Sequence, residues 1–262
     1  MQAVTGLFSS QTEAKQAVGR LQSSGVQADR ITLLTPGRSG LQKLESVPVD
    51  ATEQPGMGTA VGAIVGGAAG LSAGLVAAVV PGVGLVTAAG LLGAAVLTAA
   101  GASLGAVAGG SLENFTTEGL PEDEIFVYED ALRNGRSVVI PLAEDATAAR
   151  PIRELLQSEG AEATDAAREQ WWIGLRSAEQ EHYLKSDGNF RDDEKFYRLG
   201  FEAALHARTR CKEFDQVSAE MASDLEELKR QYPDAQIAGP FTRGYQRGRE
   251  YYQRLCEESK AA

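Results

Sequence analysis

The sequence predicts an α+β protein. A split strand-and-helix domain is interrupted by an apolar, glycine-rich helical hairpin and followed by a charged all-α domain. Residues 54–112 contain no charged side chain. Strand and helix patterns alternate on both sides of that stretch, in residues 1–53 and 113–165, whereas residues 166–262 are charged and helical in pattern. These four ranges are the units that we expect.

The first half of the split domain has a strand–helix–strand pattern. Residues 3–8 predict a short buried strand, and residues 30–34 predict a second one. Between them, Ser10 and Glu13 have the spacing of a capping box, and Gly25 suits the carboxyl end of the helix. One face of this helix carries apolar residues at i, i+3, i+4 and i+7, namely Ala14, Ala17, Val18 and Leu21.

The same kind of pattern returns after the apolar stretch. Pro121 suits the first turn of a short helix, although residues 125–128 alone could form a strand. Residues 137–140 predict the next strand, and residues 147–159 predict a helix. We expect a weak last strand at residues 161–164.

An internal repeat relates the two halves. Residues 21–28 have the sequence LQSSGVQA, and residues 156–163 have the sequence LQSEGAEA. Both segments end a helix and lead into a strand. Two such halves in tandem predict a ferredoxin-like sandwich, with four strands and two helices on one face. The apolar hairpin would then be inserted between the halves.

The apolar stretch has two arms, separated by Pro-Gly-Val-Gly at residues 81–84. Each arm is long enough to cross a bilayer as a helix of about 20 residues. Glycine at every fourth position forms a stripe without side chains, along which two helices can approach closely. We therefore expect helix packing at Gly58, Gly62, Gly66, Gly70, Gly74, Gly101, Gly105 and Gly109.

The C-terminal part predicts helices near residues 165–184, 192–210, 214–231 and 239–258. The second and fourth share the pattern aromatic-x-x-Gly-aromatic-x-x-small. Its small residues lie on one stripe of the helix with aromatic rings beside them. We expect these two helices to pack closely against each other, or against copies in another subunit, through Gly200, Ala204, Gly244 and Gly248.

Composition limits the partners and the compartment. The net charge of −11 argues against a nucleic-acid partner, because phosphate groups would repel the protein. The same charge disfavours an anionic membrane surface, so any membrane contact must come from apolar insertion. The only cysteines, Cys211 and Cys256, suit a reducing compartment, and the N-terminus lacks a signal-peptide pattern. We therefore expect the soluble domains to face the cytoplasm.

No group of residues predicts chemistry, so we expect no enzyme activity, cofactor, metal site or small-molecule substrate. Glu179 and His182 form one Glu-x-x-His step, whereas di-iron bundles need two such steps and two further glutamates. A solvated helix face is the simpler interpretation. Trp171 and Trp172 could anchor the chain at a membrane interface, but we favour a buried pair at a domain junction.

Residues 3–165 resemble the bacterial general-stress, or heat-induced stress-protein, domain. The likeness is carried by VTGLF at 4–8, DRITLL at 29–34, GLPEDE at 119–124, GRSVV at 135–139 and LLQSEGA at 155–161. Members of that family often carry a Gly/Ala-rich hydrophobic middle segment. The resemblance implies a stress-associated, membrane-linked protein without an established reaction, and it supplies no functional residues.

Two functions follow from these observations. In the first, a non-enzymatic bacterial stress-response protein inserts its glycine-rich hairpin in the cytoplasmic membrane, self-associates through it, or does both. In the second, a cytoplasmic homo-oligomeric scaffold buries the glycine arms in its assembly core. The flanks of the hairpin are acidic, so the positive-inside rule does not support the first function, insertion in the membrane. A third function, an enzyme or metal protein built on the C-terminal helices, lacks convergent His, Cys and carboxylate residues.

Overall fold

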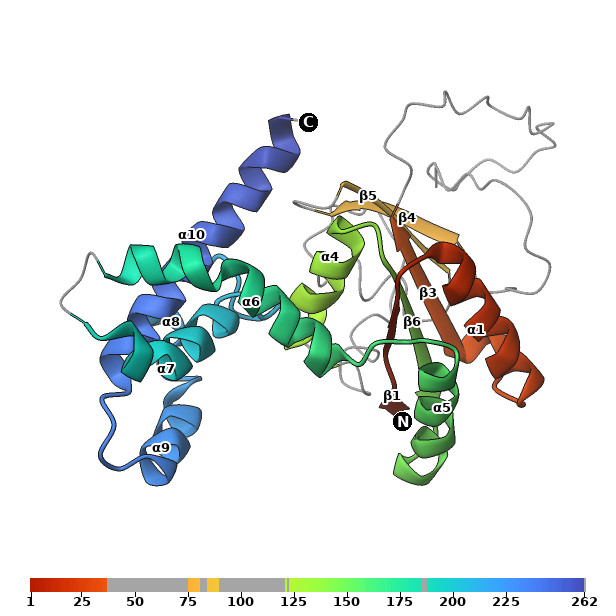
Figure 1. Ribbon diagram of the computed structural model, residues 1–262, viewed down its shortest axis with the longest axis horizontal. Coiled ribbons are helices and arrows are strands. Elements are labelled where there is room, and N and C mark those ends of the chain that lie inside the picture. The colour runs from red at the N-terminus through yellow and green to blue at the C-terminus, as the bar shows by residue number, and fades with distance from the viewer. Residues whose placement is uncertain (37–74, 81–83, 90–120, 122, 185–187, 262) are drawn as a thin grey trace, which may run out of the picture.

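The computed structural model describes residues 1–36, 75–80, 84–89, 121, 123–184 and 188–261, which form a mixed α+β structure with an antiparallel sheet (Figure 1). Its strands are β1 (Gln2–Ala3), β2 (Gly6–Phe8), β3 (Ile31–Pro36), β4 (Leu75–Val80), β5 (Gly84–Ala89) and β6 (Ser137–Ala143). Its α-helices are α1 (Gln11–Ser23), α4 (Ile125–Arg133), α5 (Ala146–Ser158), α6 (Thr164–Tyr183), α7 (Phe190–Ala203), α8 (Phe214–Val217), α9 (Ala222–Gln231) and α10 (Ala238–Ala261).

Strand β6 lies in the middle of the sheet. Val139 of β6 pairs with Gly6 of β2 on one side and with Leu33 of β3 on the other, both antiparallel. At the outer side of β2, Leu7 exchanges two backbone hydrogen bonds with Glu162, at 2.9 and 3.1 Å. The last strand expected at residues 161–164 is therefore reduced to a single bridge. The order across the sheet is residue 162, β2, β6, β3, β5 and β4.

Helices α1 and α5 cover one face of the sheet (Figure 1). Helix α1 begins as expected, because the Ser10 side chain accepts a hydrogen bond from the Glu13 N–H. Gly25 ends it with a φ of 103°, which glycine adopts without steric cost. Helix α1 buries the four apolar residues predicted from its spacing, Ala14, Ala17, Val18 and Leu21.

Helix α4 covers the opposite face and is buried nearly all round, including the charged residue Glu129. One cluster of buried side chains joins the sheet, through Leu34 and Val138, to α4, and then to Trp171 and Phe201 of the C-terminal helices. The hydrophobic core is thus continuous across residues 165 and 166. Residues 125–128 are helical, so their alternative interpretation as a strand is wrong.

Two segments in the central part of the apolar hairpin are strands and not helices, which corrects the expectation for residues 75–80 and 84–89. Strands β4 and β5 pair along their whole lengths, from Leu75 opposite Ala89 to Val80 opposite Gly84. Strand β5 also pairs with β3. The β-branched valines of these segments favour strands, and a short apolar run has no periodicity that separates helix from strand. The expected helix-packing glycines at positions 58–74 and 101–109 lie outside the described residues. Among the helices described, none has both the length and the apolar composition needed to cross a bilayer.

Two C-terminal helices also differ from expectation. Helix α7 stops at Ala203 rather than near residue 210, and the segment expected at 214–231 is divided into α8 and α9. After α7 the chain makes tight turns, which Thr209 stabilises by donating a side-chain hydrogen bond to the Ala203 carbonyl. Cys211 ends these turns with a φ of 60°. Helical periodicity alone does not reveal this break, because the turn residues are not strong helix breakers.

A buried ion pair fixes these turns against α4. The Arg210 guanidinium donates to both carboxylate oxygens of Glu129, at 2.6 and 2.9 Å. The two side chains are only 6% and 4% exposed, and Arg210 also donates to the Leu205 carbonyl and lies over the Tyr252 ring. Burial acts to raise the pKa of the Glu129 carboxyl, and the Arg210 charge opposes that rise. The pair connects the sheet half of the core to the helical half.

Arg210→Met should lower the free energy of unfolding by about 3–5 kcal/mol, because the Glu129 carboxylate would remain buried without its partner. The double variant Arg210→Met with Glu129→Met should recover most of that loss, because neither charge of the pair then remains buried. Urea denaturation of the two variants and the unaltered protein measures both effects. Equal stability of Arg210→Met and the unaltered protein would contradict the structural role of this pair.

Candidate functional site

Helices α7 and α10 lie in contact at the residues of the aromatic–glycine repeat. A Cβ atom at Gly200 would lie 2.0 Å from the Phe241 carbonyl oxygen, and one at Gly244 would lie 1.9 Å from the Tyr197 carbonyl oxygen. Gly248 lies similarly close to Phe201 and Ala204. These distances leave no room for a side chain, so glycine is required where the helices meet. The structure therefore brings Gly200, Ala204, Gly244 and Gly248 together within one chain.

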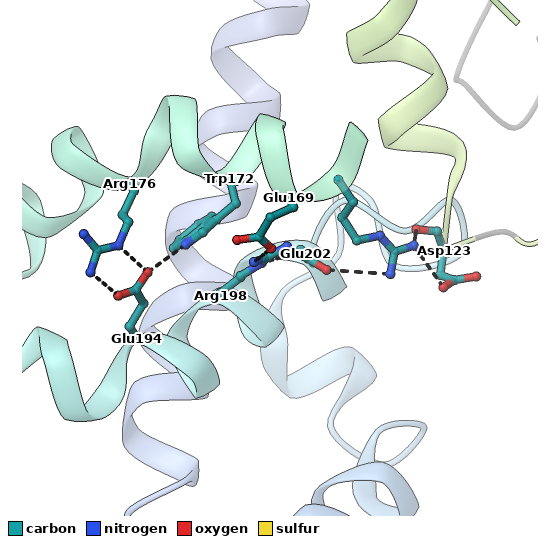
Figure 2. A network of polar contacts seen from close by, with 8 residues as sticks. Asp123, Glu169, Trp172, Arg176, Glu194, Arg198 and Glu202 are labelled. Atoms are coloured by element: carbon teal, nitrogen blue, oxygen red, sulfur yellow. Dashed lines mark hydrogen bonds and ion pairs between the residues drawn. The ribbon is translucent and has the colours of Figure 1, made fainter. Parts of the chain in front are cut away.

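Trp171 and Trp172 are both buried beside this contact, 7% and 2% exposed. The Trp172 indole donates to Glu194 at 3.0 Å, and Arg176 binds the same carboxylate with two hydrogen bonds of 2.6 Å (Figure 2). The hydrogen bonds from Arg176 lower the pKa of Glu194. The tryptophans thus occupy a protein core in this structure, as we favoured from the sequence.

A chain of ion pairs continues from there toward the sheet (Figure 2). Arg198 of α7 binds Glu169 of α6 and Glu202 of its own helix, each at 2.6 Å. Arg168 reaches Glu202 and the carboxylate of Asp123, just before α4. Each carboxylate in this chain has a cationic partner. The network holds α6, α7 and the start of α4 in position, and it leaves no carboxylate free to act as a base.

The Glu-x-x-His step is divided between the inside and the outside of α6. Glu179 is 2% exposed and accepts hydrogen bonds from Arg247 at 2.9 Å and from the Tyr197 hydroxyl at 2.8 Å. His182, three residues further along α6, is exposed, whereas the Glu179 carboxylate is bound by Tyr197 and Arg247. In the part of the chain that the structure describes, no three His, Cys, Asp or Glu side chains are grouped as metal ligands.

A cavity with a volume of about 330 Å³ lies at the other edge of the described structure. We call it the Glu124 cavity. It is bounded by the N-terminal strand, the carboxyl end of α5, the start of α6 and the start of α4. Its lining residues are Gln2, Ala3, Val4, Thr5, Pro121, Glu124, Arg153, Leu156, Gln157, Ala161, Glu162, Ala163, Thr164 and Asp165.

The cavity exists because the last strand is so short. Leu7 bonds to Glu162 on the outer side of the sheet, while Val4 donates to Pro141 of β6 on the inner side. Successive residues of a strand alternate between these sides, so the backbone groups of Ala3 and Thr5 point outward like those of Leu7. On that outer side the backbone groups of Ala3 and Thr5 have no backbone partner among the described residues, because the chain turns into α6 at Thr164.

Glu124 lies on the wall of this cavity in a short chain of hydrogen bonds. Its carboxylate accepts from the Tyr128 hydroxyl at 2.5 Å, and that hydroxyl lies 3.0 Å from the Thr5 hydroxyl. Burial raises the pKa of Glu124, although the hydrogen bond from Tyr128 acts in the opposite direction. Burial and the neighbouring Glu124 also raise the pKa of Tyr128 well above its usual value. This wall can accept a cation or donate and accept hydrogen bonds, but it contains no activated nucleophile.

Sequence reasoning missed the cavity. Glu124 and Tyr128 are four residues apart on a helix, which is the one local signal of their contact. The remaining walls come from residues 2–5 and 153–165, and only the fold brings these segments together.

Comparison with known proteins supplies no further assignment. No family model matches the chain, and no curated protein and no solved structure is significantly similar to it.

Gly244→Ala should lower the free energy of unfolding by about 1–3 kcal/mol, because the added methyl group must push α7 away from α10. Gly239→Ala is the matched control on the same helix, where the added Cβ would meet only the end of the Arg243 side chain at 3.6 Å. The control should stay within about 1 kcal/mol of the unaltered protein. Thermal unfolding of both variants measures the difference, and similar losses in the two would argue against the close contact.

Stability should fall as the pH drops from about 6.5 to about 4, because burial lowers the pKa of His206 to about 4. In that interval the unfolded chain binds a proton that the folded chain does not. The loss should reach about 2–3 kcal/mol. His206→Phe keeps an aromatic ring stacked on Phe126 and removes the titration. Its denaturation curves should lose that part of the pH dependence, and an unchanged slope would contradict the assignment.

Proposed function

We propose that the protein is a non-enzymatic bacterial stress-response protein that self-associates through its two glycine-rich arms. One observation carries the preference for self-association over a pair of membrane spans. It is the pairing of β5 with β3 and of β4 with β5, in the middle of the apolar stretch.

This pairing constrains where each arm begins and ends. The chain leaves the sheet after β3, returns to it at β4, leaves again after β5 and returns at α4. Both ends of both arms are therefore attached to one folded unit. A helix that crosses a bilayer once places its two ends on opposite sides of that bilayer. The topology thus supports arms that pack against protein, or that enter a membrane and return, over two simple spans.

The composition of the arms supports association. Residues 54–74 and 90–112 contain no charge, and residues 58–74 have glycine at every fourth position. Apolar surface of that extent is rarely exposed on a soluble monomer. Glycine stripes let helices approach closely, so arms from several copies can cover one another. Membrane association by re-entrant insertion, with the soluble parts facing the cytoplasm, is the second candidate.

The stress association rests on the resemblance of residues 3–165, and the strand order supports the fold that the resemblance implies. Strands β2 and β3 lie on either side of β6, and residue 162 lies outside β2. Two strand–helix–strand halves that interlock in this order make a ferredoxin-like domain. We infer that β4 and β5 extend such a domain at its β3 edge.

Self-association is tested on the full chain by light scattering after size separation. The unaltered protein should form a defined oligomer. Gly62→Leu with Gly66→Leu should reduce its size, because leucine side chains on the stripe keep helices apart. Ala60→Leu with Ala68→Leu adds similar bulk away from the stripe and should leave the oligomer intact. A monomeric unaltered protein, or equal effects of the two pairs, would refute association through the glycine stripe.

Membrane fractionation separates the two candidates. A self-associating scaffold should appear in the soluble fraction without detergent. Retention in the membrane pellet after carbonate washing, with release by detergent, would favour the membrane-associated candidate instead.

A further inference from the structure

We propose that the Glu124 cavity binds a small zwitterion, specifically a free amino acid. The carboxylate would lie against Arg153 and the start of α6, and the ammonium group would lie against Glu124. The proposal does not depend on self-association, because the cavity is formed by the N-terminal strand, α4, α5 and α6.

The cationic side of the cavity has two components, Arg153 and the start of α6, and Asp165 in the first turn of α6 adds one negative charge to the same lining. Arg153 projects from the exposed side of α5 and makes no ion pair with any described residue. Helix α6 begins at Thr164 after Ala163, which has no side chain to cap it. Its first intrahelical hydrogen bond is from the Ala167 N–H to the Ala163 carbonyl, so the preceding N–H groups are left without helical acceptors. Such N–H groups and the helix dipole attract a carboxylate.

The anionic side is Glu124. One of its oxygens accepts the Tyr128 hydrogen bond, and its other oxygen has no acceptor role in the described structure. The carboxylate is half-buried, so water solvates its charge poorly, and this burial raises its pKa. A bound ammonium group would supply the missing interaction with a charge-assisted hydrogen bond. Tyr128 and Thr5 hold the carboxylate in place for this contact.

The size and remaining walls of the cavity favour one small molecule. A volume of about 330 Å³ is at the low end of the range for ligand pockets, which suits a metabolite better than a folded partner. Leu156, Pro121 and Ala161 supply apolar contacts for an aliphatic side chain. The outward-facing backbone groups of Ala3 and Thr5 offer one further donor and acceptor pair for the ligand.

The test uses the full-length protein and each common L-amino acid, first by thermal shift and then by calorimetry for those that stabilise it. Matched analogues separate the two charges. For L-leucine these are 4-methylpentanoate, which lacks the ammonium group, and 3-methylbutylamine, which lacks the carboxylate; the corresponding pair is used for whichever amino acid binds best. Each analogue should bind at least about tenfold more weakly than the amino acid, because each loses one charge-assisted contact.

Arg153→Ala should weaken binding about tenfold or more and leave the melting temperature of the free protein unchanged, because the side chain is exposed. Arg150→Ala is the control: it lies on the exposed side of the same helix and does not line the cavity. Glu124→Gln should weaken the binding of the amino acid but not the binding of 4-methylpentanoate. The proposal is overturned if no L-amino acid binds, if an analogue binds as tightly as the amino acid, or if the two arginine variants behave alike.

Discussion

The structure depends on the ion pair between Glu129 and Arg210. Helix α4 has the sheet on one side and α6, α7 and α10 on the other, so it contributes to both halves of the core. Glu129 is a buried charged residue on α4 that faces the helical half, and two hydrogen bonds from Arg210 satisfy it. The tight turns that follow the end of α7 at Ala203 place Arg210 against this carboxylate, 81 residues away in sequence.

Much of the fold follows from local patterns. The cap at Ser10, the four inward residues of α1 and the glycine at position 25 were all predictable, because each is decided by neighbours within a few residues. The close contact of α7 and α10 also has a local signal, since a glycine flanked by aromatic residues at helical spacing is unusual in exposed helices. Helical periodicity, which is also a local pattern, correctly located α6 and α10.

The remainder depends on partners that are distant in sequence. Residues 75–80 and 84–89 are as apolar as a membrane helix, and they form strands where β5 pairs with the edge of β3 and β4 pairs with β5. The turns after α7 place Arg210 against Glu129, a partner that is distant in sequence. The Glu124 cavity is made of four segments whose meeting is a property of the whole topology. The cavity forms because the last strand of the sheet is reduced to a single bridge, and the absence of a strand has no hydrophobic pattern that a sequence could reveal.

The continuous core has a consequence for synthesis on the ribosome. Strands β2, β3 and β6 and helices α1 and α5 are complete once about residue 160 has emerged, whereas the apolar outer side of α4 must wait for α6, α7 and α10. At about 5–20 residues per second, that interval lasts several seconds. Throughout it, Phe126 and the Glu129 carboxylate are in contact with solvent or with another protein. The nascent chain therefore offers a chaperone a defined surface, which disappears when Arg210 and then Tyr252 arrive.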